Sequence, residues 1–126
     1  MRKQYHSRHT PEGRVIWDVH RLVELSSGFR VVEIPLTDIK ELDENYWFQD
    51  GMVPTCRAIA DHAKLIEETD LKYPIILSAN GRVMDGMHRV AKACSRGDKS
   101  IKAVQFEQDP VPDYVDVDLD TLPYDD

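Results

Sequence analysis

Residues 73–95 read YPIILSANGRVMDGMHRVAKACS, and this stretch predicts a strand, a turn, a second strand and a helix in immediate succession. The apolar run at 74–78 is typical of a buried strand. Asn80-Gly81 favours a type I′ hairpin turn, in which both central residues have positive φ. We therefore expect a second strand at 82–84 that pairs with the first.

A helix is predicted over residues 87–96, directly after this second strand. Its apolar residues recur at helical spacing, and Gly97 stands where a helix commonly ends. The expected apolar face consists of Met87, Val90, Ala91 and Cys94. Asp85 is the expected N-cap, because a short carboxylate side chain can accept hydrogen bonds from the first free backbone amides.

The start of this helix has the chemistry of an anion site. The first backbone N–H groups of a helix have no partner within it, and the helix dipole adds positive potential. Gly86 would let a ligand approach the amides near Met87, while His88 and Arg89 would add side-chain donors. The alternative is that Asp85 only caps the helix and that His88 and Arg89 are solvated surface residues.

The run PIILSANGRVMDGMHRVAKA, with the following Gly97 and the strand SIKAVQF, resembles the nucleotide-binding domain shared by ParB-type partition proteins, sulfiredoxins and free-serine kinases. Residues 31–42, VVEIPLTDIKEL, are similar to the strand and turn with which that domain opens. The resemblance covers residues 31–108, and DGMHR at 85–89 is its most specific element. It implies an α/β (α+β) fold, ParB/sulfiredoxin-like, in which a small mixed sheet of about four strands is wrapped by helices.

The chain departs from these families at Met87. Sulfiredoxins carry a reactive Cys in this turn, and a thioether cannot replace a thiolate nucleophile. Cys94 lies about two helical turns further on, so sulfinic-acid reduction is not expected. ParB-type proteins carry an acidic residue here that is implicated in nucleotide hydrolysis, and an Arg in place of His88. The free-serine kinase pattern D-G-H-H-R is the nearest match.

The resemblance implies that the DGMHR turn binds a nucleotide or another phosphorylated ligand. The candidate cofactors are ATP, ADP or CTP with magnesium, which Asp85 or an acidic residue of the turn at 42–45 would help to hold. Phosphoryl transfer or nucleotide hydrolysis would use His88 to move a proton. It would also need a carboxylate near the opening strand, for which Glu44 is the candidate beside Glu41 and Asp43.

Residues 54–68 predict the clearest helix, with Thr55 as its N-cap. Its apolar face would contain Ala58, Ile59, His62, Leu65 and Ile66. His62 is interpreted as a hydrogen-bonded core histidine. In sulfiredoxin-like proteins the corresponding helix contributes polar side chains near the phosphates. The resemblance therefore implies that Thr55 and Arg57 converge with the DGMHR turn on one anion.

Residues 1–29 are expected to form a basic arm and a short helix at 15–25. The polar stretch 1–13 has no periodicity, which is typical either of a mobile docking segment or of a frayed end. DNA binding through this arm is a weak possibility that would use its basic residues. These residues are Arg2, Lys3, Arg8 and Arg14.

An aromatic cluster, Tyr46-Trp47-Phe48, follows the opening strand and its turn. It has two interpretations. One is a platform on which a nucleotide base stacks, and the other is a loop pinned to the core by Trp47, which is the commoner role of large aromatics near a core.

Composition indicates one globular domain: the chain has 126 residues, of which 41% are hydrophobic and 31% charged. No apolar run approaches the roughly 20 residues that cross a bilayer, and no secretory signal is recognisable. We therefore expect a cytoplasmic protein without a membrane partner, and the ParB/sulfiredoxin resemblance implies one of bacterial type. Cys56 and Cys94 are expected to be reduced thiols, with no metal site.

The net charge of −7 is concentrated at the end of the chain. Residues 107–126 contain eight acidic side chains and no Lys or Arg, so the sixteen basic residues face fifteen acidic ones in residues 1–106. The expected organisation is an arm and helix at 1–29, a ParB/sulfiredoxin-like domain at 30–108 and an acidic tail at 109–126. The tail either lies extended against the body, where its charge would cover the basic site, or is solvated.

The alternative function is a non-catalytic interaction module. It would keep the fold and use the arm or the tail to bind a partner protein or DNA. No nucleophile or general base can be assigned from the sequence, which favours this alternative, whereas the DGMHR turn favours phosphate binding. A homodimer is a further possibility under either function.

Overall fold

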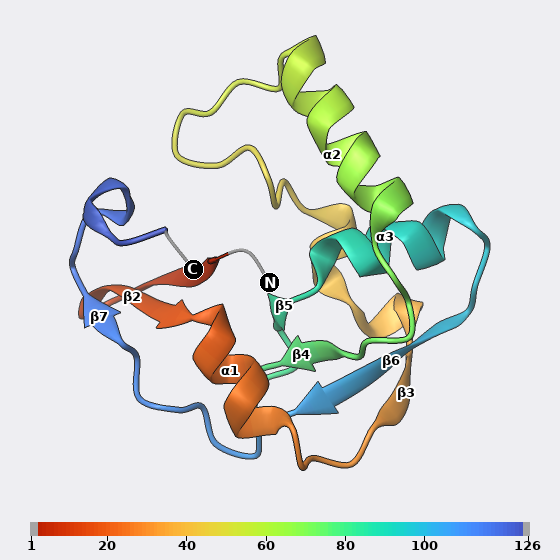
Figure 1. Cartoon of the computed structure of the whole chain (residues 1–126), viewed down its shortest axis with the longest axis horizontal. Coiled ribbons are helices and arrows are strands. Elements are labelled where there is room, and N and C mark those ends of the chain that lie inside the picture. The colour runs from red at the N-terminus through yellow and green to blue at the C-terminus, as the bar shows by residue number, and fades with distance from the viewer. Residues whose placement is uncertain (1–2, 125–126) are drawn as a thin grey trace.

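The structure is a computed structural model that describes residues 3–124, and it has a mixed α+β fold with two sheets (Figure 1). The larger sheet has the strand order β3-β6-β4-β5, in which only the β4–β6 pair is parallel. Its strands are β3 (Val32–Pro35), β4 (Ile75–Leu77), β5 (Val83–Asp85) and β6 (Ser100–Gln105). The predicted mixed sheet of four strands is therefore present.

The two faces of this sheet are covered by different helices. Ile75 and Leu77 of β4 pack with α3 (Met87–Ser95) and with the 3₁₀ turns η1 (Leu36–Asp38) and η2 (Lys40–Asp43). Ile76, between them, points to the other face, where Leu22 of α1 (Val19–Ser26) and Trp17 cover the sheet. This alternation along β4 gives the molecule its layered core.

The N-terminal segment is a hairpin and not an arm. β1 (Tyr5–Thr10) pairs with β2 (Gly13–Asp18), and β2 pairs with β7 (Tyr114–Val115) to form the second sheet. The predictions of a mobile stretch at 1–13 and of a helix from residue 15 are wrong over the described residues, whereas Arg2 of the predicted basic arm lies outside them. The helix begins only after Asp18, whose Oδ1 accepts a hydrogen bond from the amide of His20 at 2.9 Å.

The acidic tail lies against this hairpin. Trp17 Nε1 donates a hydrogen bond to the carbonyl of Pro110 at 2.8 Å, and Arg21 forms an ion pair with Asp113 at 3.2 Å. The short 3₁₀ turn η3 (Leu119–Thr121) follows β7. Of the two alternatives for the tail, contact with the body is the one observed, although the contacts are with the hairpin and α1.

The turn between β4 and β5 differs from the prediction. Of the two central residues of this turn, Asn80 and Gly81, only Gly81 has a positive φ, 84°, so the turn is not type I′. The side chain of Asn80 accepts hydrogen bonds from the hydroxyl of Ser78 and from the amide of Arg82. The φ of Asn80 is not positive, and the pairing of β4 with β5 shifts register between Ile76 and Leu77.

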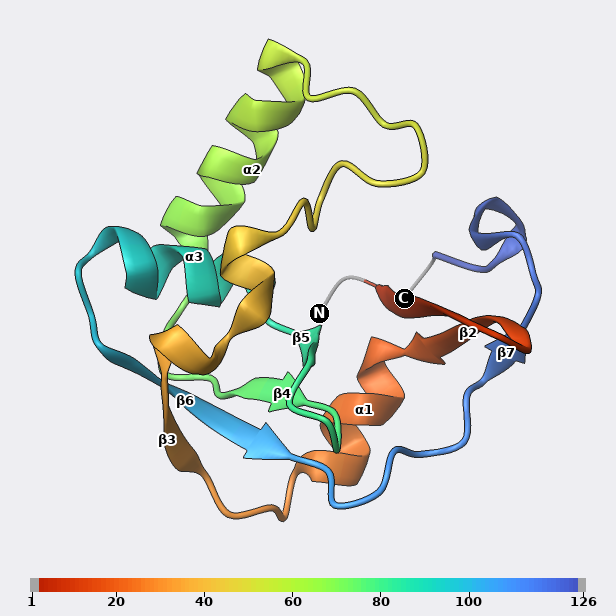
Figure 2. The ribbon, with the colours of Figure 1, turned by 180° about the vertical axis from the view of Figure 1, so that it is seen from behind.

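Helix α2 (Cys56–Glu68) stands away from the sheet and contacts the molecule near its C-terminal end (Figure 2). Thr55 is its N-cap, as predicted, and the Thr55 hydroxyl accepts a hydrogen bond from the amide of Ala58 at 3.1 Å. No residue of α2 is fully buried. Within residues 3–124, no helix has the length and apolar character needed to cross a membrane.

Candidate functional site

The start of α3 is shaped by Gly86. This residue has φ 108°, and a Cβ atom there would lie 2.6 Å from Ile75 Cγ2 and 2.7 Å from Arg89 Nη2. No side chain caps α3, so the prediction that Asp85 is the N-cap is wrong. Asp85 instead ends β5. The first-turn amides of α3, at Met87 and beyond, therefore remain available to another acceptor.

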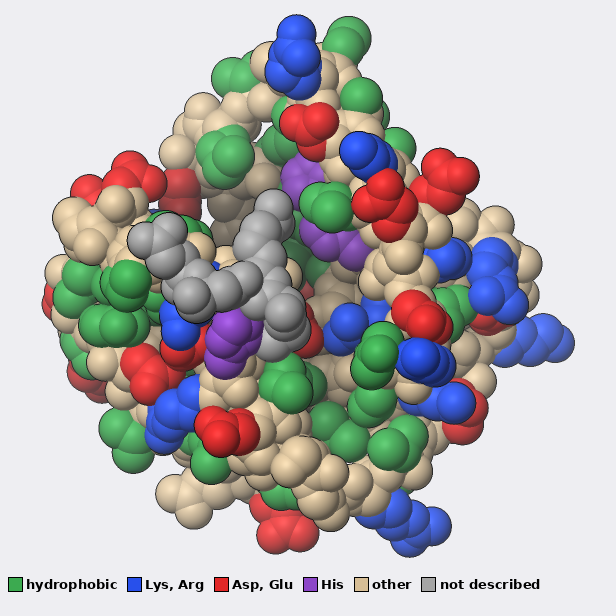
Figure 3. Space-filling model, in the orientation of Figure 1, with side chains coloured by type: hydrophobic (Ala, Val, Ile, Leu, Met, Phe, Trp, Pro, Cys, Tyr) green, Lys and Arg blue, Asp and Glu red, His purple; other side chains and the backbone are tan. Residues whose placement is uncertain are grey.

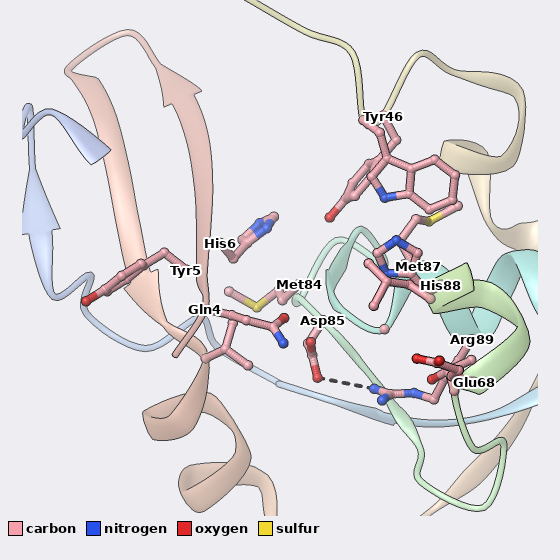
Figure 4. Close-up of a pocket in the computed structure, with 15 residues that line it drawn as sticks. Gln4, Tyr5, His6, Tyr46, Glu68, Met84, Asp85, Met87, His88 and Arg89 are labelled. Atoms are coloured by element: carbon pink, nitrogen blue, oxygen red, sulfur yellow. Dashed lines mark hydrogen bonds and ion pairs between the residues drawn. The ribbon is translucent and has the colours of Figure 1, made fainter. Parts of the chain in front are cut away.

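Asp85 and Arg89 form an ion pair across the first turn of α3 (Figure 4). Arg89 Nη2 lies 3.2 Å from Asp85 Oδ2 and 3.4 Å from the carbonyl of Pro74, and both charged side chains are about one-sixth exposed. Arg89 Nε is buried without an acceptor, and Nη1 makes no hydrogen bond to a described residue. Three of the five N–H donors of this guanidinium thus have no acceptor among the described residues, and the two on Nη1 are the ones a ligand could reach.

A cavity of about 440 Å³ adjoins this turn. Its walls come from β1 of the hairpin, from Tyr46 and Trp47 of the aromatic cluster, from the C-terminal end of α2 and from the β5–α3 junction (Figure 4). In Figure 3 the surface is hollowed between α2 and the hairpin, with histidine side chains beside the hollow. The lining includes both signs of charge, because Glu68 and Asp85 are present with Arg89.

Two histidines meet beside the cavity. His62 Nδ1 lies 2.9 Å from His88 Nε2, and the indole of Trp47 stacks over both rings with centroid distances of 4.5 and 4.8 Å. Burial lowers the pKa of His62, while the charge of Asp61 acts in the opposite direction. The hydrogen bond predicted for His62 exists, but its partner is His88. Sequence spacing gave no sign of this pair, since 26 residues separate its members.

Tyr46 and His6 extend the lining of the cavity. Burial raises the pKa of Tyr46 to about 12, and the carboxylates of Glu41 and Asp85 act in the same direction. Burial lowers the pKa of His6 to about 4. At neutral pH the phenol is therefore a hydrogen-bond donor and the imidazole is uncharged. The sequence did not identify His6, because its segment was assigned to an arm.

The aromatic cluster is partly explained by packing. Tyr46 and Trp47 pack against the core cluster under α3, and one face of Trp47 is occupied by the two imidazoles. This arrangement supports the interpretation in which Trp47 pins its loop to the body. It also means that a base could stack only on the remaining face of the indole.

Three predicted site residues lie elsewhere. Thr55 and Arg57 are exposed at the N-terminal end of α2 and do not line the cavity, which α2 reaches only with Leu65, Glu68 and the following Thr69. The predicted convergence of Thr55 and Arg57 with the α3 turn is therefore wrong, because α2 runs toward the site with its C-terminal end. Glu44 is also outside the cavity lining.

The acidic turn at 41–44 is committed to other contacts. Glu44 forms an ion pair with Arg82 at 2.7 Å. Glu41 is buried, and its carboxylate accepts a hydrogen bond from the amide of Val83 at 2.7 Å. The hydrogen bond that Arg82 donates to Glu44 raises the pKa of Arg82. Neither carboxylate is placed next to His88 in the cavity lining, so Glu44 is not positioned as its catalytic partner.

This arrangement can bind an oxyanion and can move a proton through the imidazole pair, and its donors come from one helix start and one guanidinium. Within residues 3–124, no cluster of three or more His, Cys, Asp or Glu side chains could hold a metal ion unaided. Comparisons with family models, curated proteins and solved structures found no match to this chain.

Proposed function

We propose that residues 30–108 form a ParB/sulfiredoxin-like domain that binds a nucleotide or another phosphorylated ligand at the start of α3. The observation that carries the proposal is the uncapped helix start at Gly86, on the wall of a cavity of about 440 Å³. Helix starts favour anions, and cavities of this size hold small ligands. The resemblance of the DGMHR turn to that domain points in the same direction.

The phosphate oxygens would accept hydrogen bonds from the amides of Met87 and His88 and from the free donors of Arg89. His88, held by His62, would donate a further hydrogen bond. Glu68 and Asp85 repel a phosphate, so binding would require magnesium, which supplies positive charge to the phosphate. The oxygen donors of these two carboxylates fit that ion, whose remaining ligands would be phosphate oxygens and water.

A thermal-shift series tests the proposal. The chain would be melted with ATP, ADP, CTP, GTP and pyrophosphate, each with and without magnesium. At a ligand concentration 100-fold above Kd, mass action adds about 2.7 kcal/mol of stability, so we expect one ligand to raise Tm in a magnesium-dependent way.

The matched variants are Arg89→Lys and Arg96→Lys. Both keep the charge, but only the first removes the planar fork from the cavity, since Arg96 is exposed at the other end of α3. We expect Arg89→Lys to abolish most of the shift and Arg96→Lys to keep it. If no ligand shifts the melt, or if both variants respond as the unmodified chain does, phosphate binding at α3 is excluded.

Whether phosphoryl transfer or hydrolysis follows binding depends on His88. With Glu44 paired to Arg82, His88 in the imidazole pair is the remaining one of the two predicted catalytic residues that could take a proton from an attacking hydroxyl or water. Product analysis with the bound nucleotide, in the presence of free serine or water alone, would test this step. His88→Gln should abolish any turnover that is found.

A second candidate function is a non-catalytic interaction module. The observation that favours it is the apolar surface around the start of α2, where Met52, Val53 and Ile59 are each more than half exposed. Sedimentation velocity tests self-association through this surface. Under this function Ile59→Asp should dissociate a dimer, whereas Val111→Asp, also at an exposed apolar position, should not.

A further inference from the structure

A second cavity, of about 720 Å³, is bordered by the same Asp85–Arg89 pair. It lies on the α1 side of the larger sheet, between the end of α1, the segment that leads into β3 and the start of β4. The phosphate site proposed above makes no use of this space. Its volume falls within the range of small-molecule sites in proteins.

The walls of this cavity are apolar. Ile76 and Val104 of the sheet are buried beneath it, and the hydroxyl of Ser26 is already used in a hydrogen bond to the carbonyl of Leu22 at 2.8 Å. The exposed apolar residues at its rim are Val23, Phe29, Val31 and Tyr73. Apolar side chains that gather at one opening usually mark a binding surface. The walls therefore suit the hydrocarbon part of a ligand.

Asp85 and Arg89 are the only charged side chains among the described residues that line this cavity. The carboxylate of Asp85 is already paired with Arg89, whereas Arg89 has donors at Nε and Nη1 without an acceptor among the described residues. A guanidinium N–H donor binds a carboxylate through a charge-assisted hydrogen bond, and the Nη1 donors of Arg89 are the ones that are not enclosed. The polar end of the cavity thus suits an anionic head group.

We propose that this cavity binds a small monocarboxylic acid with an aliphatic or aromatic body, whose carboxylate accepts hydrogen bonds from Arg89. The body of the ligand lies against Ile76 and Val104, and its far end reaches the rim at Val23. This site is separate from the phosphate site in its walls and in the chemistry of its ligand, although both sites share Arg89.

Three probes with the same eight-carbon tail test the head group: octanoate, 1-octanol and octylammonium, each titrated calorimetrically into the full chain. We expect octanoate to bind at least about tenfold more tightly than octanol, because a charge-assisted hydrogen bond is worth about one to two factors of ten in affinity. Octylammonium should bind most weakly. Equal affinities for the three probes would overturn the proposal. A preference for octylammonium would also overturn it, because it would show that the head group of the ligand is a cation that binds Asp85.

Two variants of α1 locate the binding site. Val23 and Leu25 are exposed by 40% and 45% on the same helix, but only Val23 lines the cavity. Val23→Glu places a negative charge at the opening and should weaken octanoate binding about tenfold. Leu25→Glu should leave the affinity within about twofold. An equal effect of the two variants would show that octanoate binds elsewhere.

The same variants separate this proposal from the phosphate site. Val23 does not line the first cavity, so a nucleotide-dependent rise in Tm should survive in Val23→Glu. Loss of octanoate binding with retained nucleotide binding supports two sites. Octanoate binding without any nucleotide effect would support the apolar site alone, and failure of octanoate to bind the unmodified chain would exclude the apolar site whatever the nucleotides do.

Discussion

At the scale of single residues, Gly86 is the position that sets the geometry of both proposed sites. Its left-handed backbone turns the chain from β5 into α3, and its missing side chain leaves space that Ile75 and Arg89 fill. A residue with a Cβ atom would both strain the backbone and displace Arg89. The position of the guanidinium therefore depends on the glycine three residues before it.

Gly86→Ala should lower the free energy of unfolding by about 2–3 kcal/mol, because the strain of positive φ adds to the clash with Ile75. Gly97→Ala is the matched control. Gly97 also has a positive φ, 78°, but a Cβ atom there would meet nothing within 4 Å, so we expect a loss of about 1 kcal/mol. Urea unfolding measures both, and equal losses would contradict the role of the clash.

His6 should make stability depend on pH. Its pKa falls from 6.5 to about 4 on folding because it is buried, so the folded chain binds its proton less readily than the unfolded chain. The stability contributed by the neutral ring is complete above pH 6.5 and is lost as the pH falls toward 4. One pKa unit corresponds to about 1.4 kcal/mol, so the loss should reach about 3 kcal/mol.

His6→Phe provides the control for this pH dependence. The His6 ring stacks on Trp17 and its Nε2 has no hydrogen-bond partner, so a phenyl ring can take its place without leaving a polar group unpaired. Urea unfolding of both proteins between pH 7.5 and 4 would show a smaller slope for the variant. Identical slopes would assign the pH dependence to other groups, such as His62.

The candidate site could be predicted only where its residues are neighbours in sequence. DGMHR was found because Gly, His and Arg at a helix start form a local pattern, and that stretch does begin α3. The pairing of His62 with His88 and the commitment of Glu44 to Arg82 are contacts over 26 residues or more. Local patterns carry no information about such contacts.

At the scale of elements, the helices and strands of the larger sheet followed from periodicity, whereas β1 did not. Residues 5–10 read YHSRHT, which has neither apolar alternation nor β-branched enrichment beyond Thr10. They form a strand because they pair with the edge of β2, and this tertiary pairing outweighs their weak strand propensity. Helix α2 is the opposite case. Its amphipathic pattern predicts the helix correctly, but none of its residues is buried.

Hydrogen exchange should separate α2 from α3. Amides at 60–64 should exchange at least about tenfold faster than those at 91–95, because α2 buries no side chain whereas α3 buries Met87, Val90 and Ala93. The measurement is exchange at neutral pH followed by NMR or mass spectrometry. Equal protection in a dilute sample would contradict this, and protection that rises with concentration would indicate a second copy bound over α2.

At the scale of the whole molecule, the N-terminal hairpin and the described part of the acidic tail pack together. β7 pairs with β2, and Leu122 is 7% exposed although it lies in the acidic tail. The mixture of apolar and acidic residues in the tail is therefore explained by packing on one side and solvent on the other. The sequence left this choice open, because composition alone does not say which surface a tail meets.

Deletion of residues 110–126 should lower the free energy of unfolding by at least about 2 kcal/mol. It would expose the apolar surface that Leu122 covers and remove the acceptor of the Trp17 Nε1 hydrogen bond. Asp113→Asn weakens a partly exposed ion pair with Arg21 and keeps an amide oxygen that can accept the hydrogen bond from the Asp18 amide, so it should cost about 1 kcal/mol. A deletion no more costly than this substitution would show that the tail adds nothing to the fold.

The guanidinium of Arg89 borders two cavities, so a ligand in one cavity would change the affinity for a ligand in the other. A phosphate that draws Arg89 away from Asp85 in the first cavity changes the donors left for a carboxylate in the second. Linkage then requires octanoate to alter nucleotide affinity by the same factor by which the nucleotide alters octanoate affinity. The two occupants would be antagonists if they compete for the same N–H groups, and cooperative if each frees the donors that the other needs.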